Sequence, residues 1–281
     1  MSSALSPTDL TRLIQFNHNE KLLAHMPVVS EDLLAGLYGL DVAGYHKQRA
    51  RFAENARGAA RELLAEPAFA LRVDRLPFAP RAVVVGLGDS ITDDLQSWLE
   101  ILRHLLELRR GTDGIVVVNA GVSGETTAQM LARFVEVAAQ QPAWVLCLGG
   151  TNDARRHGQR PAKTLVSLDE TERNLMALRH FAATQTAARW LWLTPATVVE
   201  AAIAADPFLS GQQLSWRNDD LAAIAATVRR QPDPCVDVQS RFGRPANPDL
   251  LLPDGLHPNL AGQTLIARAV VERLGELWQT S

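Results

Sequence analysis

The sequence predicts an α/β protein: a three-layer α/β/α sandwich with a five-stranded parallel sheet, preceded by an α-helical N-terminal region. Two observations carry this prediction. From residue 81 onward, short apolar runs rich in β-branched residues alternate with longer segments whose apolar residues recur at helical spacing. Polar clusters that contain glycine follow these runs, at the points where the strands of a parallel sheet would end.

The first 80 residues predict helices without strands. Ser30, Glu31 and Asp32 place a cap and two acids before an apolar series, which is typical of a helix start. Residues 43–65 are dominated by Ala, Arg, Glu and Leu and contain no proline, whereas Pro77 and Pro80 end the region. We therefore divide the chain into a helical N-terminal region, residues 1–80, and a catalytic domain, residues 81–281.

The predicted strands are nearly continuous apolar runs, at residues 82–85, 115–118, 144–148, 190–193 and 235–238. Strands of this kind are buried on both faces of a parallel sheet. Helical spacing of apolar residues predicts covering helices over residues 95–106, 130–138 and 265–274. Right-handed crossovers then bring the carboxyl ends of all five strands to one edge, where such sheets bind their ligands.

Composition excludes several classes of protein. The 281 residues carry a net charge of −3, which argues against a nucleic-acid footprint. The two cysteines, Cys147 and Cys235, cannot form a disulfide framework or a four-ligand zinc site. Residues 1–20 contain Asp9, Arg12 and Asn17 where a signal peptide needs an apolar stretch, and no window is long and apolar enough to span a membrane. We therefore expect a cytoplasmic protein.

The polar clusters rule out three nucleotide or hydrolase motifs. The sequence Gly86-Leu87-Gly88 follows the first strand, but the third glycine of a dinucleotide-binding fingerprint is replaced by Ile91, and Asn119-Ala120 stands where an acid would hold the ribose. No glycine-rich turn runs into Gly-Lys-Ser/Thr, and no Gly-x-Ser-x-Gly elbow is present.

Acyl transfer fits the clusters better. Ser90 follows the first strand where the chain turns into a helix, so its hydroxyl would be exposed at the ligand-binding edge. His257 lies in a turn-rich cluster, and Asp254 precedes it by three residues, close enough to orient the imidazole. The backbone N–H groups of Ser90 and Gly121 and the amide of Asn152 could stabilise an oxyanion.

At this point the residues resemble a known family. Gly88-Asp89-Ser90, Gly121, Gly150-Thr151-Asn152-Asp153 and Asp254-x-x-His257 look like the four sequence blocks of the SGNH (GDSL-type) serine hydrolases, in that family's order. The resemblance runs from Val83 to about Leu274 and implies the flavodoxin-like SGNH hydrolase fold. It also implies Ser90 as nucleophile, His257 as base, Asp254 as orienting acid, and Ser90, Gly121 and Asn152 as the oxyanion hole.

Each of these residues also has a structural interpretation. Ser90 could be a helix N-cap, Asp254 a turn residue and Asn152 a cap for the next segment. We interpret Asp89, Asp153 and Thr151 as structural. The remaining histidines lack ligand spacing, and we interpret them as surface or packing residues: His18, His25, His46, His104, His157 and His180.

Four further residues are candidates for substrate binding. Arg155 and Arg156 follow the third block directly, and we expect either a solvated loop or a contact with an anionic group of the substrate. The connection from Thr194 to Trp216 is too long for an ordinary loop between helix and strand. Its apolar residues, among them Phe208 and Trp216, could form a lid, an acyl-pocket wall or extra core.

The prediction is a serine esterase that hydrolyses carboxylic esters, short-chain acyl or acetyl esters of small molecules or sugars, through an acyl-enzyme on Ser90. It needs no cofactor and no metal. The alternatives are an acyltransferase, a thioesterase or a lysophospholipase that uses the same residues, or a catalytically idle protein that binds a glycan or acyl group. Residues 1–80 are expected either to cap the pocket or to form the contact of a homo-oligomer.

Overall fold

The computed structural model describes residues 7–21, 29–158 and 163–279, and it confirms the predicted sheet. Five parallel strands run in the order β2-β1-β3-β5-β7. They are β1 (Val83–Gly88), β2 (Val116–Gly121), β3 (Trp144–Leu148), β5 (Arg189–Leu193) and β7 (Cys235–Val236). The chain passes from β1 to β2 at one edge of the sheet. It then returns across β1 and adds β3, β5 and β7 toward the other edge.

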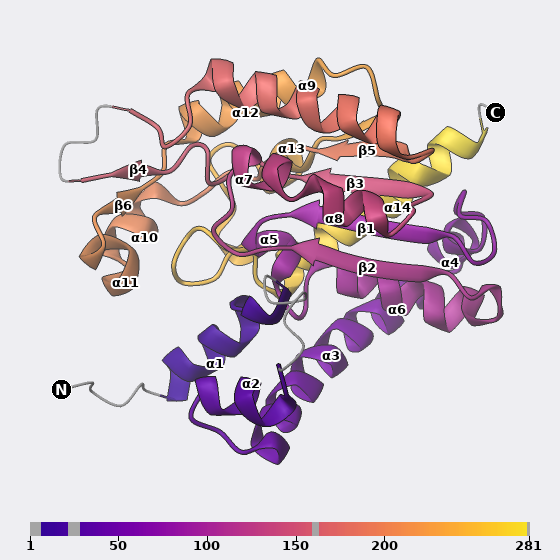
Figure 1. The fold of residues 1–281 in the computed structure, drawn as a ribbon, viewed down its shortest axis with the longest axis horizontal. Coiled ribbons are helices and arrows are strands. Elements are labelled where there is room, and N and C mark those ends of the chain that lie inside the picture. Colours follow the sequence, from indigo (N-terminus) through magenta and orange to yellow (C-terminus); the bar gives the residue numbers. More distant parts are fainter. Residues whose placement is uncertain (1–6, 22–28, 159–162, 280–281) are drawn as a thin grey trace.

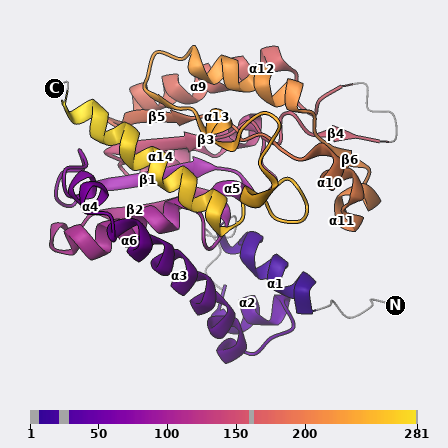
Figure 2. The same ribbon diagram turned by 180° about the vertical axis from the view of Figure 1, so that it is seen from behind.

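Helices cover both faces of this sheet (Figures 1 and 2). Alternate strand residues feed two separate cores, since Val84 packs on one side of β1 and Val85 on the other. One side is covered by α3 (Val42–Leu64), α4 (Pro67–Asp74), α6 (Trp98–Arg110), α13 (Val238–Phe242) and α14 (Leu260–Gln279). The other is covered by α7 (Thr127–Ala132), α8 (Phe134–Ala139), α9 (Leu168–Gln185) and α12 (Asn218–Arg229).

The predicted helices differ from the observed ones at their ends. α6 begins only at Trp98 because the Ser97 side chain caps it and accepts a hydrogen bond from the N–H of Glu100. The segment 130–138 is two short helices, since Arg133 leaves the helical conformation at φ −103° and ψ 11°. Across the described ranges, no helix has the length and apolar character needed to cross a membrane.

Short elements complete the fold at the carboxyl ends of the strands. They are α5 (Ser90–Asp93), α10 (Glu200–Ala205), α11 (Pro207–Gly211) and an antiparallel ribbon of β4 (Arg156–His157) and β6 (Leu214–Ser215). Short 3-10 turns, η1 (Asn19–Lys21), η2 (Gly111–Asp113) and η3 (Pro248–Leu250), lie elsewhere in the chain. The ribbon was not predicted, because two-residue strands carry too little periodicity to read.

The helices of the N-terminal region share their core with the sheet. Buried residues of α3 and α4, including Leu63 and Phe69, belong to the same apolar cluster as Trp98 of α6 and Val270 of α14. α2 (Glu31–Leu37) packs on α3 and begins at Ser30, whose side chain accepts from the N–H of Leu33. That residues 1–80 and 81–281 are separate folding units stays a prediction. The shared core argues against separate folding.

A further helix, α1 (Pro7–Phe16), was not predicted, and it is fixed to the sheet by buried polar contacts. Gln15 Nε2 donates to both carboxylate oxygens of Asp94, at 3.1 and 3.0 Å, and the N–H of Leu95 donates to the carbonyl of Gln15. His18 Nδ1 lies 2.8 Å from a carboxylate oxygen of Asp93. α1 therefore docks on the segment that follows β1.

Replacing Phe69 tests whether the two regions unfold together. All six tryptophans lie beyond residue 80, so their fluorescence reports the catalytic domain alone. Phe69 is 2% exposed, and Phe69→Ala should lower the free energy of unfolding seen by tryptophan by about 3–5 kcal/mol. The control is Leu71→Ala on the same helix, where the side chain is 51% exposed. An unmoved tryptophan transition in Phe69→Ala would mean that the N-terminal helices fold separately.

Asp94 makes stability depend on pH. Complete burial raises the pKa of its carboxyl to about 7 from 3.8, although hydrogen bonds from Gln96, Gln15 and Gln263 act in the other direction. Because the folded-state pKa is the higher one, the stabilisation from this proton is complete below about pH 4 and is lost as the pH rises to about 7.

The variant Asp94→Asn lacks this titration. The unfolding free energy of the native protein, measured against that of Asp94→Asn in urea, should therefore fall between pH 4 and 7 with a slope of at most about 1.4 kcal/mol per pH unit. Burial also raises the pKa of Asp89, but both proteins contain Asp89, so its contribution cancels in the difference. A difference between the native protein and Asp94→Asn that stays flat over this range would contradict the prediction.

Candidate active site

Ser90 is the first residue of α5 and follows β1 directly, as the sequence predicts. Asp89 caps this helix, since its carboxylate accepts a hydrogen bond from the N–H of Ile91 at 3.0 Å. The predicted N-cap alternative for Ser90 is therefore wrong, because the residue before it fills that position. As a first-turn residue, Ser90 has an N–H with no partner inside the helix.

His257 and Asp254 lie beside Ser90, although 167 residues separate Ser90 from His257. His257 Nε2 is 3.1 Å from Ser90 Oγ, and His257 Nδ1 is 2.8 Å from Asp254 Oδ2. A carboxylate can only accept, so Nδ1 carries the proton and Nε2 of the neutral ring is free to accept from the serine hydroxyl. The three groups thus form one hydrogen-bonded chain that ends at an oxygen nucleophile.

The loop sequence holds Asp254 in place. Its Oδ1 accepts from the backbone N–H groups of Leu256 and His257, at 2.9 and 3.0 Å, which forms the tight turn between the two residues. Gly255 adopts φ +71°, where a side chain would also collide with the Val199 carbonyl. Burial opposes ionisation of Asp254, but the imidazole and these N–H groups hold the pKa of its carboxyl well below its usual range.

Asn152 is placed to donate toward the serine. It is buried, and its Nδ2 donates to the carbonyl of Glu125 at 3.1 Å, which fixes the amide plane. The amide has two N–H bonds, so one remains for a ligand in the cavity that Asn152 lines. The structure therefore brings Asn152 to the same cavity as Ser90 and His257.

Gly121 does not reach that cavity. Its N–H donates to Asn119 Oδ1 at 3.0 Å, and a side chain there would meet the backbone of Asp93 at 2.5 Å. The structure therefore contradicts the prediction that the N–H of Gly121 donates to the oxyanion. Gly124, three residues later, lines the cavity instead, at φ +84° and with open space around its Cα.

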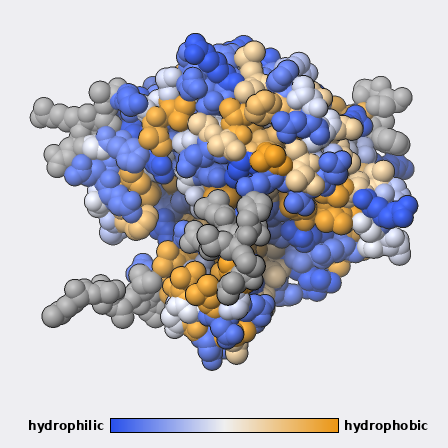
Figure 3. All heavy atoms as spheres, in the orientation of Figure 1, coloured by the Kyte–Doolittle hydropathy of each residue, from blue (hydrophilic) through white to orange (hydrophobic). Residues whose placement is uncertain are grey.

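The cavity beside Ser90 has a volume of about 640 Å³. Its walls come from α1, from the turn after β2, from the turn after β3 and from α11 with β6. In the view of Figure 3 the molecule is hollowed between the lobe of N-terminal helices and the main body, on the side where α1 and α11 lie. Large apolar side chains supply a substantial part of the lining: Leu13, Phe16, Phe208, Leu209, Leu214, Trp216 and Leu256.

Three of the four candidate substrate residues line this cavity. Trp216 is buried and donates from Nε1 to the Thr151 carbonyl at 2.8 Å, whereas Phe208 is 60% exposed. Leu209 and Trp216 also belong to the core, so the long connection serves both as cavity wall and as packing. Arg155 lines the cavity too, and burial lowers the pKa of its guanidinium.

Arg156 has a different place. Its guanidinium donates two hydrogen bonds to Asp220, at 2.7 and 2.9 Å, and it is not among the cavity residues. The expectation that it contacts substrate is wrong for that reason. One of the predicted structural residues, Asp153, does form a buried network, since it accepts from Thr127 and Thr171 and lies beside Asn152.

The sequence analysis missed the contribution of α1 to the site. Arg12 Nη2 donates to Asp254 Oδ2 at 2.6 Å, and the Phe16 ring lies 4.7 Å from the His257 ring. A signal for this helix exists. Pro7 and Asp9 are typical of a first turn, and Leu10, Leu13 and Ile14 follow at helical spacing.

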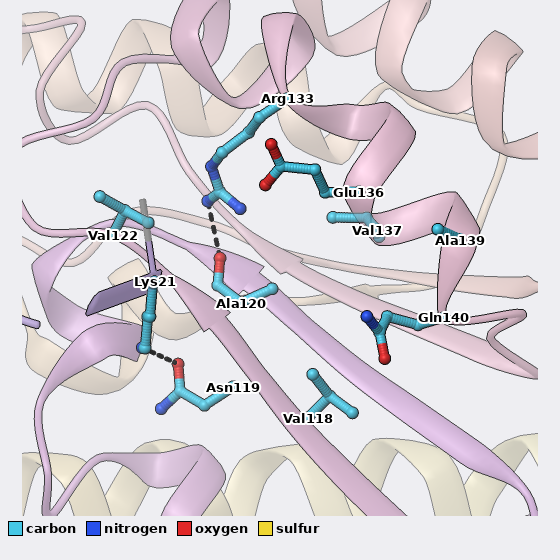
Figure 4. Close-up of a pocket in the computed structure, with 10 residues that line it drawn as sticks. All are labelled: Lys21, Val118, Asn119, Ala120, Val122, Arg133, Glu136, Val137, Ala139 and Gln140. Atoms are coloured by element: carbon cyan, nitrogen blue, oxygen red, sulfur yellow. Dashed lines mark hydrogen bonds between the residues drawn. The ribbon is translucent and has the colours of Figure 1, made fainter. Parts of the chain in front are cut away.

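A second hollow, of about 340 Å³, lies along the open edge of β2 (Figure 4). Lys21 donates to Asn119 Oδ1 at 3.2 Å on one side of the strand, and Arg133 donates to the Ala120 carbonyl at 2.6 Å on the other. None of the described residues that line it is a serine, histidine or cysteine. Nor do the described ranges contain a cluster of histidine, cysteine and acidic residues placed to hold a metal ion. Of these two hollows, the one beside Ser90 brings a serine hydroxyl together with a histidine and its acid.

Comparison with known proteins agrees with this geometry. The model of the GDSL-like Lipase/Acylhydrolase family matches residues 87–265. The chain is 31% identical over 179 residues to an acetylxylan esterase of Geobacillus stearothermophilus, which covers 60% of this chain and 76% of that enzyme.

Solved structures agree as well. A catalytic mutant of an acetylxylan esterase from Geobacillus stearothermophilus, with a serine replaced, superposes with a TM-score of 0.55 at 25% identity, over 71% of this chain and 97% of that one. An alpha/beta hydrolase from the metagenome of Lake Arreo, Spain, gives 0.54 at 25% identity, over 70% and 97%. Other catalytic mutants of the esterase replace an aspartate and a histidine three positions apart, the spacing of Asp254 and His257 here.

The family match covers more than half of the chain, and it includes the nucleophile candidate, the turns after β2 and β3, and the Asp254–His257 loop. The chain therefore belongs to the GDSL-like lipase/acylhydrolase family and is a hydrolase of ester bonds.

Proposed function

We infer that this protein hydrolyses short-chain acyl esters, acetyl esters of sugars foremost, through an acyl-enzyme on Ser90. One observation carries the proposal: the unbroken hydrogen-bonded series from Ser90 Oγ through His257 to the buried Asp254, at the floor of a cavity. The acetyl part rests on the similarity to acetylxylan esterase.

The reaction begins when Ser90 Oγ attacks the carbonyl carbon of the ester and His257 Nε2 takes the hydroxyl proton. The tetrahedral oxyanion accepts hydrogen bonds from the N–H of Ser90, the N–H of Gly124 and the amide of Asn152. Each such donor is worth about 10²–10³ in kcat. Asp254 keeps the proton on Nδ1 and stabilises the imidazolium that forms.

The C–O bond of the tetrahedral intermediate then breaks, and the alcohol leaves with the proton from His257 Nε2. Water takes the place of the alcohol, gives a proton to His257 and attacks the acyl carbon of the Ser90 ester. Collapse of the second intermediate releases the carboxylic acid and returns the proton to Ser90 Oγ. Every step uses the same three donors and the same base.

The cavity walls suggest where the two halves of the substrate lie. Phe208 and Trp216 would pack against the acyl group or the sugar ring, and Arg155 would donate to an oxygen of the substrate. Within the described ranges, Arg155 Nε is buried without a hydrogen-bond partner, so a ligand oxygen would satisfy it. The apolar lining also favours a second candidate, an esterase or lysophospholipase for longer acyl chains.

Replacement of the nucleophile tests the proposal directly. Ser90→Ala should lose hydrolysis of 4-nitrophenyl acetate to the level of the uncatalysed reaction and should no longer react with a fluorophosphonate probe, while its unfolding midpoint stays near that of the native protein. The control is Ser167→Ala, which removes the cap of α9 and should keep both activities. Retained hydrolysis in Ser90→Ala would overturn the proposal, and a native protein that neither reacts with the probe nor hydrolyses esters would favour an idle binding protein.

A series of acyl chains distinguishes the substrates. We expect kcat/KM to be highest for acetyl and to fall from four carbons upward, with acetylated xylose sugars among the best substrates. A maximum at eight carbons or more would favour the longer-chain enzyme. Addition of alcohol, sugar and thiol acceptors to the same assays, with product analysis by mass spectrometry, separates hydrolysis from acyl transfer, and thioester substrates test thioesterase activity.

A further inference from the structure

We propose that helix α1 is part of the active site and that Arg12 is a positioning residue for the Asp254–His257 pair. The inference rests on the proposed function of these two residues. It assigns a role to residues 7–21, which lie outside the family match at residues 87–265.

The hydrogen bonds of Asp254 carry the argument. Oδ1 accepts two backbone N–H groups of its own loop, and Oδ2 accepts from His257 Nδ1 at 2.8 Å and from Arg12 Nη2 at 2.6 Å. The carboxylate is 1% exposed, so its partners in the native protein are these four donors and not solvent. Without Arg12, Oδ2 would keep only the imidazole as a donor, and the orientation of the carboxylate toward Nδ1 would depend on the two backbone N–H groups at Oδ1 alone.

Arg12 also joins this loop to the cavity wall. Its Nη1 lies 3.5 Å from Asp206, the residue that caps α11, and its guanidinium lies 5.7 Å from the centre of the Phe208 ring. Since Phe208 lines the cavity, one guanidinium contacts both the acid behind the base and the wall against which the substrate packs.

α1 is held firmly enough for this role. The Ser123 hydroxyl donates to the Phe16 carbonyl, and Ser123 itself lies beside Gly124 in the turn that lines the cavity. Gln15 donates to the buried Asp94 at the end of α5, and the Phe16 ring lies against the His257 ring. The helix therefore contacts the elements that carry the nucleophile, the base and a proposed oxyanion donor.

The charge of Arg12 should be visible in the pH dependence. Arg12 places a positive charge beside Asp254, and this charge disfavours a positive charge on the neighbouring imidazole. Removal of Arg12 should therefore make protonation of His257 easier. The other charged groups that face the imidazole are Asp254 on its own loop, Asp9 on α1, Asp206 before α11, Asp89 and Asp94 at the two ends of α5, and Arg155 across the cavity. All of them stay unchanged in a variant of Arg12.

The experiment compares Arg12→Ala and Arg12→Lys with the native protein, and Arg61→Ala serves as the matched control. Arg61 lies in the N-terminal region and pairs with Glu54 on the exposed face of α3. For 4-nitrophenyl acetate, Arg12→Ala should lower kcat by about tenfold or more. KM should change less, the acid limb of the kcat/KM profile should move to higher pH, and guanidinium at millimolar concentration should restore part of the rate. Arg12→Lys should keep more activity than Arg12→Ala, and Arg61→Ala should match the native enzyme.

A role limited to holding α1 in place gives a different result. In that case Arg12→Ala would lower the unfolding midpoint and raise KM, guanidinium would not rescue kcat, and the acid limb would not move; this outcome overturns the proposal. So does a variant that keeps native kcat and pH profile. If the native protein hydrolyses no ester, the proposed function has failed instead, and the rate of fluorophosphonate labelling of Ser90 in native protein and Arg12→Ala then decides whether Arg12 acts on the nucleophile.

Discussion

Parallel strand pairing is the constraint on which the site depends. β1, β2 and β3 are paired in register, with Gly88 opposite both Gly121 and Leu148, so the three strands end at the same level. The segments that follow them must therefore turn at one edge. Ser90, Gly124 and Asn152 reach the cavity from these turns, and the loop before α14 brings His257 to the same edge. No local preference of any one segment would bring residues so distant in sequence together.

This constraint explains why much of the fold could be predicted. Apolar runs that are buried on both faces are long enough to recognise, and the order of polar clusters after them indicates the ligand-binding edge. The same reasoning located Ser90, Asp254, His257 and Asn152, because each belongs to a short segment with its own local turn chemistry. Side-chain direction could not be predicted in this way. Arg155 and Arg156 are neighbours, yet one lines the cavity and the other pairs with Asp220, a residue on α12.

The choice between Gly121 and Gly124 shows the same limit within one turn. Both glycines follow β2, and sequence alone does not reveal which N–H the side chain of Asn119 will accept. In the structure Asn119 accepts from Gly121, and the turn through Val122 and Ser123 carries Gly124 into the cavity. Helix α1 was missed for another reason. Its helical spacing is present in the sequence, but its place at the site is not, because Arg12, Gln15 and the following His18 bond to residues about 75 to 240 positions away.

Electrostatics explains why α1 lies where it does. The edge around Ser90 gathers several buried aspartates, among them Asp89, Asp93, Asp94 and Asp254, and burial of so many carboxylates is costly unless donors or cations meet them. Residues 81–281 hold an excess of acids over bases, but the cations that contact these aspartates come from residues 12 and 21. Lys21 lies 2.5 Å from Asp93 and Arg12 lies 2.6 Å from Asp254, while Gln15 donates to Asp94. Of these four, Asp89 and Asp94, which no cation contacts among the described residues, are the ones whose pKa burial raises, to about 6 and about 7. A helical region with no net charge can therefore contribute to this edge, because two of its cations, Arg12 and Lys21, lie opposite buried acids.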